Sequence, residues 1–95
     1  MSGIQYVGTA YIGPSNNAAY TGTAGSVGPV GAQTYKVRVV CTTDAFVTSD
    51  GSTPSATSGA YVVGLTPEYF TVRPNSTIKA VQVSSAGTLY VTECV

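Results

Sequence analysis

Large apolar side chains occupy every second position between residues 35 and 41. The residues at these positions are Tyr35, Val37, Val39 and Cys41, and Lys36, Arg38, Val40 and Thr42 stand between and after them. Successive side chains of a strand point to opposite faces of a sheet, so this period of two predicts a half-buried β-strand. Leucine occurs only at positions 65 and 89, whereas the strand formers Val, Thr and Tyr are abundant. The composition therefore favours an all-β fold.

Short strand-like segments separated by turn residues continue to the end of the chain. They cover residues 45–48, 60–63, 68–73, 77–84 and 88–93. Many short strands at this spacing predict a small antiparallel β-sandwich, jelly-roll-like, over residues 35–95. Its core is expected to contain Val39, Phe70, Val81 and Leu89.

The first 34 residues differ in composition from the rest of the chain. They contain seven glycines and no charged residue, and glycine recurs at every third position from Gly22 to Gly31. This spacing favours extended backbone with little capacity for a core of its own. We therefore predict an extended glycine-rich N-terminal arm over residues 1–34, with one strand possible over residues 4–12. Deletion of residues 1–31 is then expected to leave a folded domain that assembles poorly.

Charge and residue content exclude several classes of function. Four basic residues balance four acidic ones, and the chain has no histidine and two cysteines. A Ser-His-Asp triad or a Cys-His dyad is therefore excluded, and two cysteines alone cannot complete a zinc site. Four cations cannot neutralise the roughly six to ten phosphates of a DNA site, and no apolar run reaches the roughly 18 residues of a membrane span. We expect no enzyme activity, no metal or other cofactor, no nucleic acid and no membrane partner.

The low charge and the seven tyrosines point instead to protein contacts. Tyrosine combines a large apolar ring with a polar tip and is enriched at interfaces. Tyr6, Tyr11 and Tyr20 lie in the glycine-rich segment, where no core is expected, so they are predicted partner-contact residues. A net charge of zero and several strand edges favour a homo-oligomer, a trimer or a dimer, over a free monomer.

Four segments, in this order, carry a resemblance to a known group of proteins. They are V-R-V-V-C-T-T-D-A-F-V at 37–47, T-P-S-A-T-S at 53–58, T-P-E-Y-F-T-V at 66–72 and S-A-G-T-L-Y-V-T-E at 85–93. Their order and spacing resemble small structural proteins of tailed bacteriophages. The resemblance covers about residues 35–93 and leaves residues 1–34 outside.

This resemblance implies a virion component with a compact β-sandwich. The function that it implies is that of a capsid cement, or decoration, protein that binds the major capsid protein or other virion proteins and stabilises the head shell. The alternative is a tail- or fibre-associated adhesive module that binds host surface glycans. Residues 1–5 have no basic or apolar character of a secretory signal, so we expect assembly in the bacterial host cytoplasm. There Cys41 and Cys94 are expected to remain thiols, with a disulfide between them as the alternative.

Overall fold

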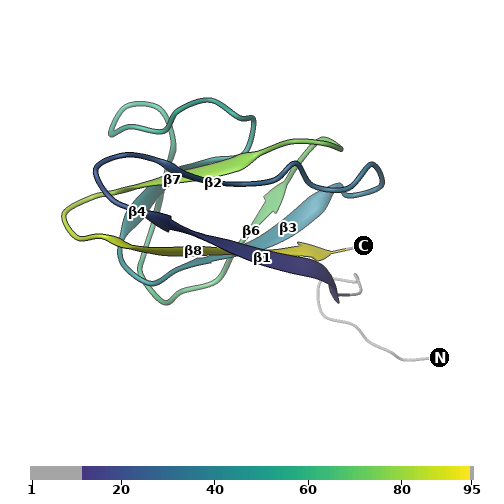
Figure 1. Ribbon diagram of the computed structural model, residues 1–95, viewed down its shortest axis with the longest axis horizontal. Helices are drawn as coiled ribbons and strands as arrows, with labels where there is room; N and C mark the ends of the chain where they lie inside the picture. Colours follow the sequence, from purple (N-terminus) through teal and green to yellow (C-terminus); the bar gives the residue numbers. More distant parts are fainter. Residues whose placement is uncertain (1–11, 95) are drawn as a thin grey trace.

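The computed structural model describes residues 12–94, which form two antiparallel four-stranded sheets (Figure 1). The first sheet has the strand order β1-β8-β3-β6, and the second has the order β2-β7-β4-β5. The strands are β1 (Ile12–Tyr20), β2 (Gly25–Val27), β3 (Lys36–Cys41), β4 (Ala45–Thr48), β5 (Ala60–Val62), β6 (Glu68–Thr71), β7 (Ile78–Gln82) and β8 (Gly87–Cys94). The predicted all-β antiparallel sandwich is confirmed.

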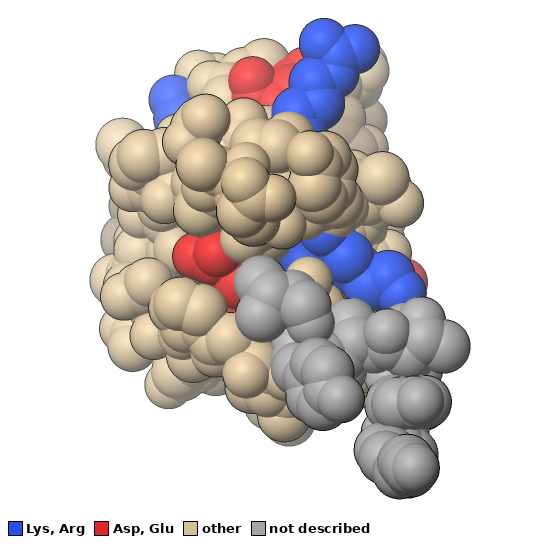
Figure 2. All heavy atoms as spheres, turned by 90° about the vertical axis from the view of Figure 1, so that its right-hand side faces the viewer, with Lys and Arg blue, Asp and Glu red and all other residues tan. Residues whose placement is uncertain are grey.

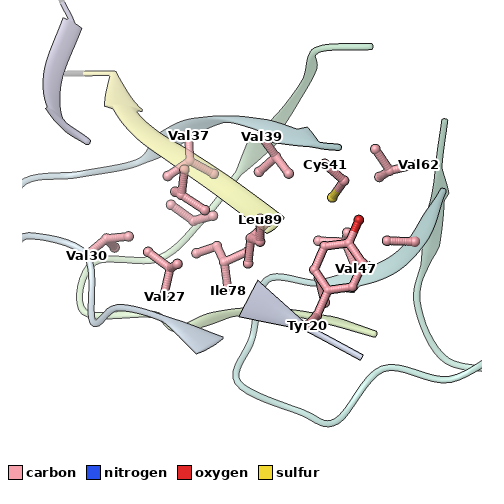
Figure 3. Packing of buried hydrophobic residues seen from close by; sticks show 14 residues of the cluster. Tyr20, Val27, Val30, Val37, Val39, Cys41, Val47, Val62, Ile78 and Leu89 are labelled. Atoms are coloured by element: carbon pink, nitrogen blue, oxygen red, sulfur yellow. The ribbon is translucent and has the colours of Figure 1, made fainter. Parts of the chain in front are cut away.

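The alternation in the sequence determines which side chains form the core. Along β3, Val37, Val39 and Cys41 are buried, while the residues between them are partly exposed. β8 lies beside β3 and alternates in the same way, with Leu89 and Val91 directed inward. Figure 3 shows these side chains packed against those of the second sheet. The two central strands of the first sheet therefore present one face to the core and the other to solvent.

Residues 12–34 belong to the sandwich, so the predicted boundary at residue 34 is wrong for this part of the chain. β1 pairs with β8, β2 pairs with β7, and Tyr20, Val27 and Val30 are buried in the common core (Figure 3). The strand expected over residues 4–12 lies outside the described residues, except for Ile12.

Close packing explains the glycine at position 25. A Cβ atom on Gly25 would collide with the main-chain carbonyl oxygen of Ala19, so glycine allows β2 to approach β1. The loop after β2 is tied to β8, because the Glu93 carboxylate accepts hydrogen bonds from the Gly31 amide (3.0 Å) and the Thr34 hydroxyl. Gly25 and Gly31 therefore lie in close contact with the rest of the sandwich and do not belong to an independent arm.

Two of the four predicted core residues are fully buried. Val39 and Leu89 have no exposed surface, which confirms the prediction for them. Phe70 is half-buried and packs against the edge of the core. The prediction for Val81 is wrong, because Ile78 and Ala80 hold the inward positions of β7 and direct Val81 to the outer face.

Four connections lie at one end of the sandwich, which we call the loop end. They are residues 21–24, 42–44, 63–67 and 83–86, which join β1 to β2, β3 to β4, β5 to β6 and β7 to β8. The strand registers place them together, since Tyr20 pairs with Gly87, and Ala45 pairs with both Val62 and Gln82. β8, which ends at Cys94, runs away from the loop end toward the C-terminal mark at the right of Figure 1.

Candidate interaction surfaces

The outer face of the first sheet carries two half-exposed tyrosines beside two cations. Tyr69 on β6 pairs with Arg38 on β3, and Tyr90 on β8 pairs with Val40. Residues paired in this way point to the same side of a sheet, which for these is the side away from the core. Tyr69 is 49% exposed and Tyr90 is 44% exposed. With Lys36, Arg38 and Val40 these residues form a surface that we call the tyrosine face.

The tyrosine face contains two basic side chains, Lys36 and Arg38. The Lys36 ammonium lies 6.0 Å from the centre of the Tyr69 ring, which is the geometry of a cation–π contact. Among the described residues, no carboxylate lies on this face. Asp44 and Asp50 are in loops, Glu68 is opposite Val39 on the inward side of β6, and Glu93 is buried.

Charged groups are sparse on the surface as a whole. Figure 2 looks at the end of the molecule opposite the loop end, and most of the described surface that it shows belongs to uncharged residues. This agrees with the charged content of 8%. The surface therefore presents mainly uncharged groups.

The loop end contains a hydrogen-bonded carboxylate. Asp44 accepts a hydrogen bond from the Tyr61 hydroxyl at 2.6 Å and another from the Gly64 amide at 2.7 Å. The Tyr61 hydroxyl, followed by the Gly64 amide, holds the pKa of Asp44 below its usual range because both stabilise the anion. The same hydrogen bond raises the pKa of Tyr61. These bonds fix the loop after β5 to the loop before β4.

A polar hollow of about 310 Å³ lies beside this carboxylate. It is lined by Thr42, Thr43, Asp44, Gly64, Leu65, Ser84 and Ser85. The lining offers hydroxyls that can donate or accept hydrogen bonds and a carboxylate that accepts them. This hollow therefore presents hydrogen-bonding groups to solvent.

The structure tests the predicted partner contact for only one of the three tyrosines named from the sequence. Tyr6 and Tyr11 lie outside the described residues, so their role stays a prediction. The prediction for Tyr20 is wrong, because this residue is 1% exposed and its hydroxyl bonds to Thr43. A partner cannot contact a side chain that fills the core.

Sequence reasoning did not single out Tyr69 and Tyr90 as contact residues. Their outward positions in the alternating pattern of β6 and β8 could have identified them. Tyr69 precedes the inward-facing Phe70, and Tyr90 stands between the buried Leu89 and Val91. An aromatic residue at the outward position of a strand is exposed by the geometry of the sheet.

The two cysteines are free thiols, as predicted. Cys41 pairs with Leu89 and Cys94 pairs with Lys36, so the cysteines stand at opposite ends of the β3–β8 ladder. Burial raises the pKa of Cys41 to about 11, which keeps this thiol protonated and unreactive at neutral pH. Neither cysteine bonds to the other.

Within residues 12–94, no group of three or more His, Cys, Asp or Glu side chains could hold a metal ion. In the same range, no helix is long and apolar enough to cross a membrane. The expectations of no enzyme activity and no cofactor stay predictions. No family model, curated protein or solved structure matches the chain.

Proposed function

We propose that the protein is a structural component of a bacteriophage virion, namely a capsid cement protein that binds the head shell and stabilises it. The observation that carries this proposal is the tyrosine face, with Tyr69 and Tyr90 exposed beside Lys36 and Arg38. Tyrosine and arginine are enriched at protein interfaces, where they supply large contact areas. The resemblance of residues 35–93 to phage structural proteins supports the same function.

The position of these side chains on a sheet suits a protein that docks on a lattice. Tyr90 and Arg38 belong to β8 and β3, the two inner strands of the first sheet, whose opposite faces are buried in the core. A surface held in this way loses little conformational freedom on binding, so more of the contact energy remains as affinity. The partner that we propose is the major capsid protein or another virion protein.

The assembly that we propose is a homo-oligomer, a trimer or a dimer, located in the virion. Closed symmetric oligomers match the symmetry axes of a shell, and several copies bound at once gain avidity. A nucleic acid or a membrane is not a proposed partner.

The proposal is tested by mixing the purified protein with capsids from which the bound copies of this protein have been removed. Stoichiometric co-sedimentation with the shells, together with a raised dissociation temperature of the shells, is the expected result. A protein that stays in the supernatant at every concentration would contradict the proposal. Bovine serum albumin mixed with the same shells controls for trapping.

The polar hollow at the loop end favours a second candidate, an adhesive module of a tail or fibre that binds glycans. Asp44 and the hydroxyls of Thr43, Ser84 and Ser85 can exchange hydrogen bonds with sugar hydroxyls. Binding to a glycan array that Asp44→Asn abolishes, without binding to capsids, would favour this candidate. Capsid binding that Asp44→Asn leaves intact would favour the cement protein.

A further inference from the structure

β1 is a long strand at the border of the first sheet. Within residues 12–94 it pairs only with β8, so its other edge is open (Figure 1). None of its nine residues is charged. The main-chain N–H and C=O groups along such an edge need hydrogen-bond partners, and another extended strand supplies them.

The other border strands of the described sandwich are shorter. β2 and β5 have three residues each, and β6 has four. β6 also begins at the charged Glu68, directly after Pro67. Short strands, charges and prolines are the features that protect a sheet edge from another chain. β1 is therefore the border strand best able to accept a partner.

The hydrogen bonds of β8 show which way the main chain of β1 faces. The Thr42 amide donates to the Thr88 carbonyl oxygen, so Thr88 directs its main-chain groups toward β3. Successive residues of an antiparallel strand alternate in this direction, so Val91 directs its groups toward β1. The partner of Val91 on β1 is Asn16. The main-chain groups of Asn16 therefore face β8.

By the same alternation, Ser15 and Asn17 direct their N–H and C=O groups toward the open edge. The side chains of Ser15, Asn16 and Asn17 are all exposed. The open edge ends at Ala19, whose carbonyl oxygen lies against Gly25, and the register with β8 shifts before Ser15. The open and regular part of the edge is therefore centred on Asn16.

We propose that β1 of one copy pairs with β1 of a second copy, antiparallel, about a two-fold axis at Asn16. Ser15 of each copy then exchanges main-chain hydrogen bonds with Asn17 of the other. An open antiparallel edge carries both donors and acceptors, so it is complementary to itself, as a two-fold contact requires. The side-chain amides of the two Asn16 residues also both donate and accept. Two uncharged strands meet without repulsion between like charges.

The pairing joins the first sheets of two copies into one continuous sheet. Opposite residues of antiparallel strands lie on the same side of a sheet, so both tyrosine faces point in the same direction. The two Tyr90 residues are then separated by three strand spacings, about 14 Å. This inference rests on the homo-oligomer part of the proposed function and selects the dimer. A dimer of this form presents two docking surfaces to one shell at once.

The first test traps the pair with a disulfide. Opposite residues that do not exchange main-chain hydrogen bonds have Cα atoms about 4.5 Å apart, which a disulfide can span. Asn16→Cys should therefore form a covalent dimer under mild oxidation. Asn17→Cys is the matched control, because the two copies of this residue lie more than about 7 Å apart and should not be linked. Both variants carry Cys94→Ser, since Cys94 is partly exposed.

Cross-linking of Asn16→Cys that is absent, or no greater than that of Asn17→Cys, would overturn the inference.

The second test places charges on the axis. Asn16→Lys and Asn16→Asp should each be monomeric in sedimentation velocity, because like charges directly opposite each other repel. An equimolar mixture of the two variants should form a heterodimer. Asn16 is exposed, so the melting temperature of each variant should stay close to that of the wild type. A mixture that contains only monomers would overturn the inference.

Binding to capsids stripped of their bound copies separates this inference from the proposed function. Asn16→Lys should bind them more weakly than the wild type, because a monomer loses avidity. Dimers that do not bind capsids would reject the cement function and leave the strand pairing. Wild type that binds capsids, when Asn16→Cys gives no covalent dimer, would reject the strand pairing and leave the cement function. If Asn16→Lys then also failed to bind, the edge of β1 would pair with a strand of the shell instead.

Discussion

The hydroxyl of Tyr20 donates a hydrogen bond to the main-chain carbonyl oxygen of Thr43, 2.7 Å away. Tyr20 ends β1 in the first sheet, and Thr43 lies in the loop that leads from β3 in the first sheet to β4 in the second. The ring of Tyr20 is buried in the core that both sheets share (Figure 3). The N-terminal part of the described chain therefore closes the sandwich.

Tyr20→Phe tests this bond. The change keeps the ring and removes the hydroxyl, which leaves the Thr43 groups without their partner. We expect a loss of about 1–2 kcal/mol in the free energy of unfolding, measured by urea denaturation. Tyr90→Phe, at an exposed position, is the control and should change it by less than about 0.5 kcal/mol. Equal stability of the two variants would contradict the role of Tyr20.

Deletion of residues 1–31 tests whether residues 12–31 belong to the fold. The sequence predicts a folded remainder, but the structure predicts an unfolded one, because the deletion removes β1, β2 and the buried Tyr20, Val27 and Val30. Circular dichroism in the far ultraviolet should show a disordered chain without a cooperative thermal transition. A cooperative transition would restore the boundary at residue 34.

Gly25→Ala tests the close approach of β2 to β1. A Cβ at this position would collide with the Ala19 backbone, which cannot move away as a flexible side chain could. We expect a destabilisation of about 1–3 kcal/mol or more by urea denaturation, as for other overpacked sites. Gly22→Ala is the matched control, because nothing lies within 4 Å of its added methyl group. If the two variants lose equal stability, β2 is not packed against β1 in this way.

The strands from β3 onward could be predicted from the sequence because their alternation is clear. β4 begins and ends at the predicted residues, since Ala45 and Val47 face inward and a turn follows. The inward face of β7 could not be predicted, because apolar residues occupy both of its faces. Nothing in the periodicity decides between Ile78 and Val81, and only the neighbouring strands do.

The role of residues 12–34 could not be predicted because their packing depends on backbone rather than on apolar side chains. Position 25 requires glycine because a larger residue would collide with the Ala19 backbone. In the sequence, a glycine that packs closely looks the same as a glycine in a flexible segment. The tyrosine face was missed for a related reason. Arg38 and Tyr69 are about 30 positions apart in the sequence, and only the antiparallel register of β3 and β6 brings them together.

We predict that the Asp44 carboxylate contributes to stability in a way that depends on pH. Its folded-state pKa is lowered by the Tyr61 hydroxyl and the Gly64 amide, so the anion stabilises the fold above the ordinary pKa of about 3.9. This contribution is lost as the pH falls through the folded-state value. Asp44→Asn should therefore melt at a lower temperature than the wild type at neutral pH.

The difference between Asp44→Asn and the wild type should shrink between about pH 5 and about pH 2, followed by differential scanning calorimetry. Asp50→Asn is a useful comparison, because hydrogen bonds from Ser52 also lower the pKa of Asp50 but tie it to a different loop. A difference for Asp44→Asn that stays constant with pH would mean that its charge does not contribute.

The measurement that tests the central claim most directly is binding of the wild type and of the double variant Tyr69→Ser/Tyr90→Ser to emptied capsids, at about 0.05 and 0.5 M salt. Tyr35→Ser, at another exposed tyrosine that is not on the tyrosine face, is the control. We predict that the wild type and the control stay bound at both salt concentrations, because few ion pairs are available to screen, and that the double variant is lost at both. Retention of the double variant would contradict docking through the tyrosine face. Release of the wild type at the higher salt concentration would contradict docking by the two tyrosine rings and would assign it to the cations Lys36 and Arg38 instead.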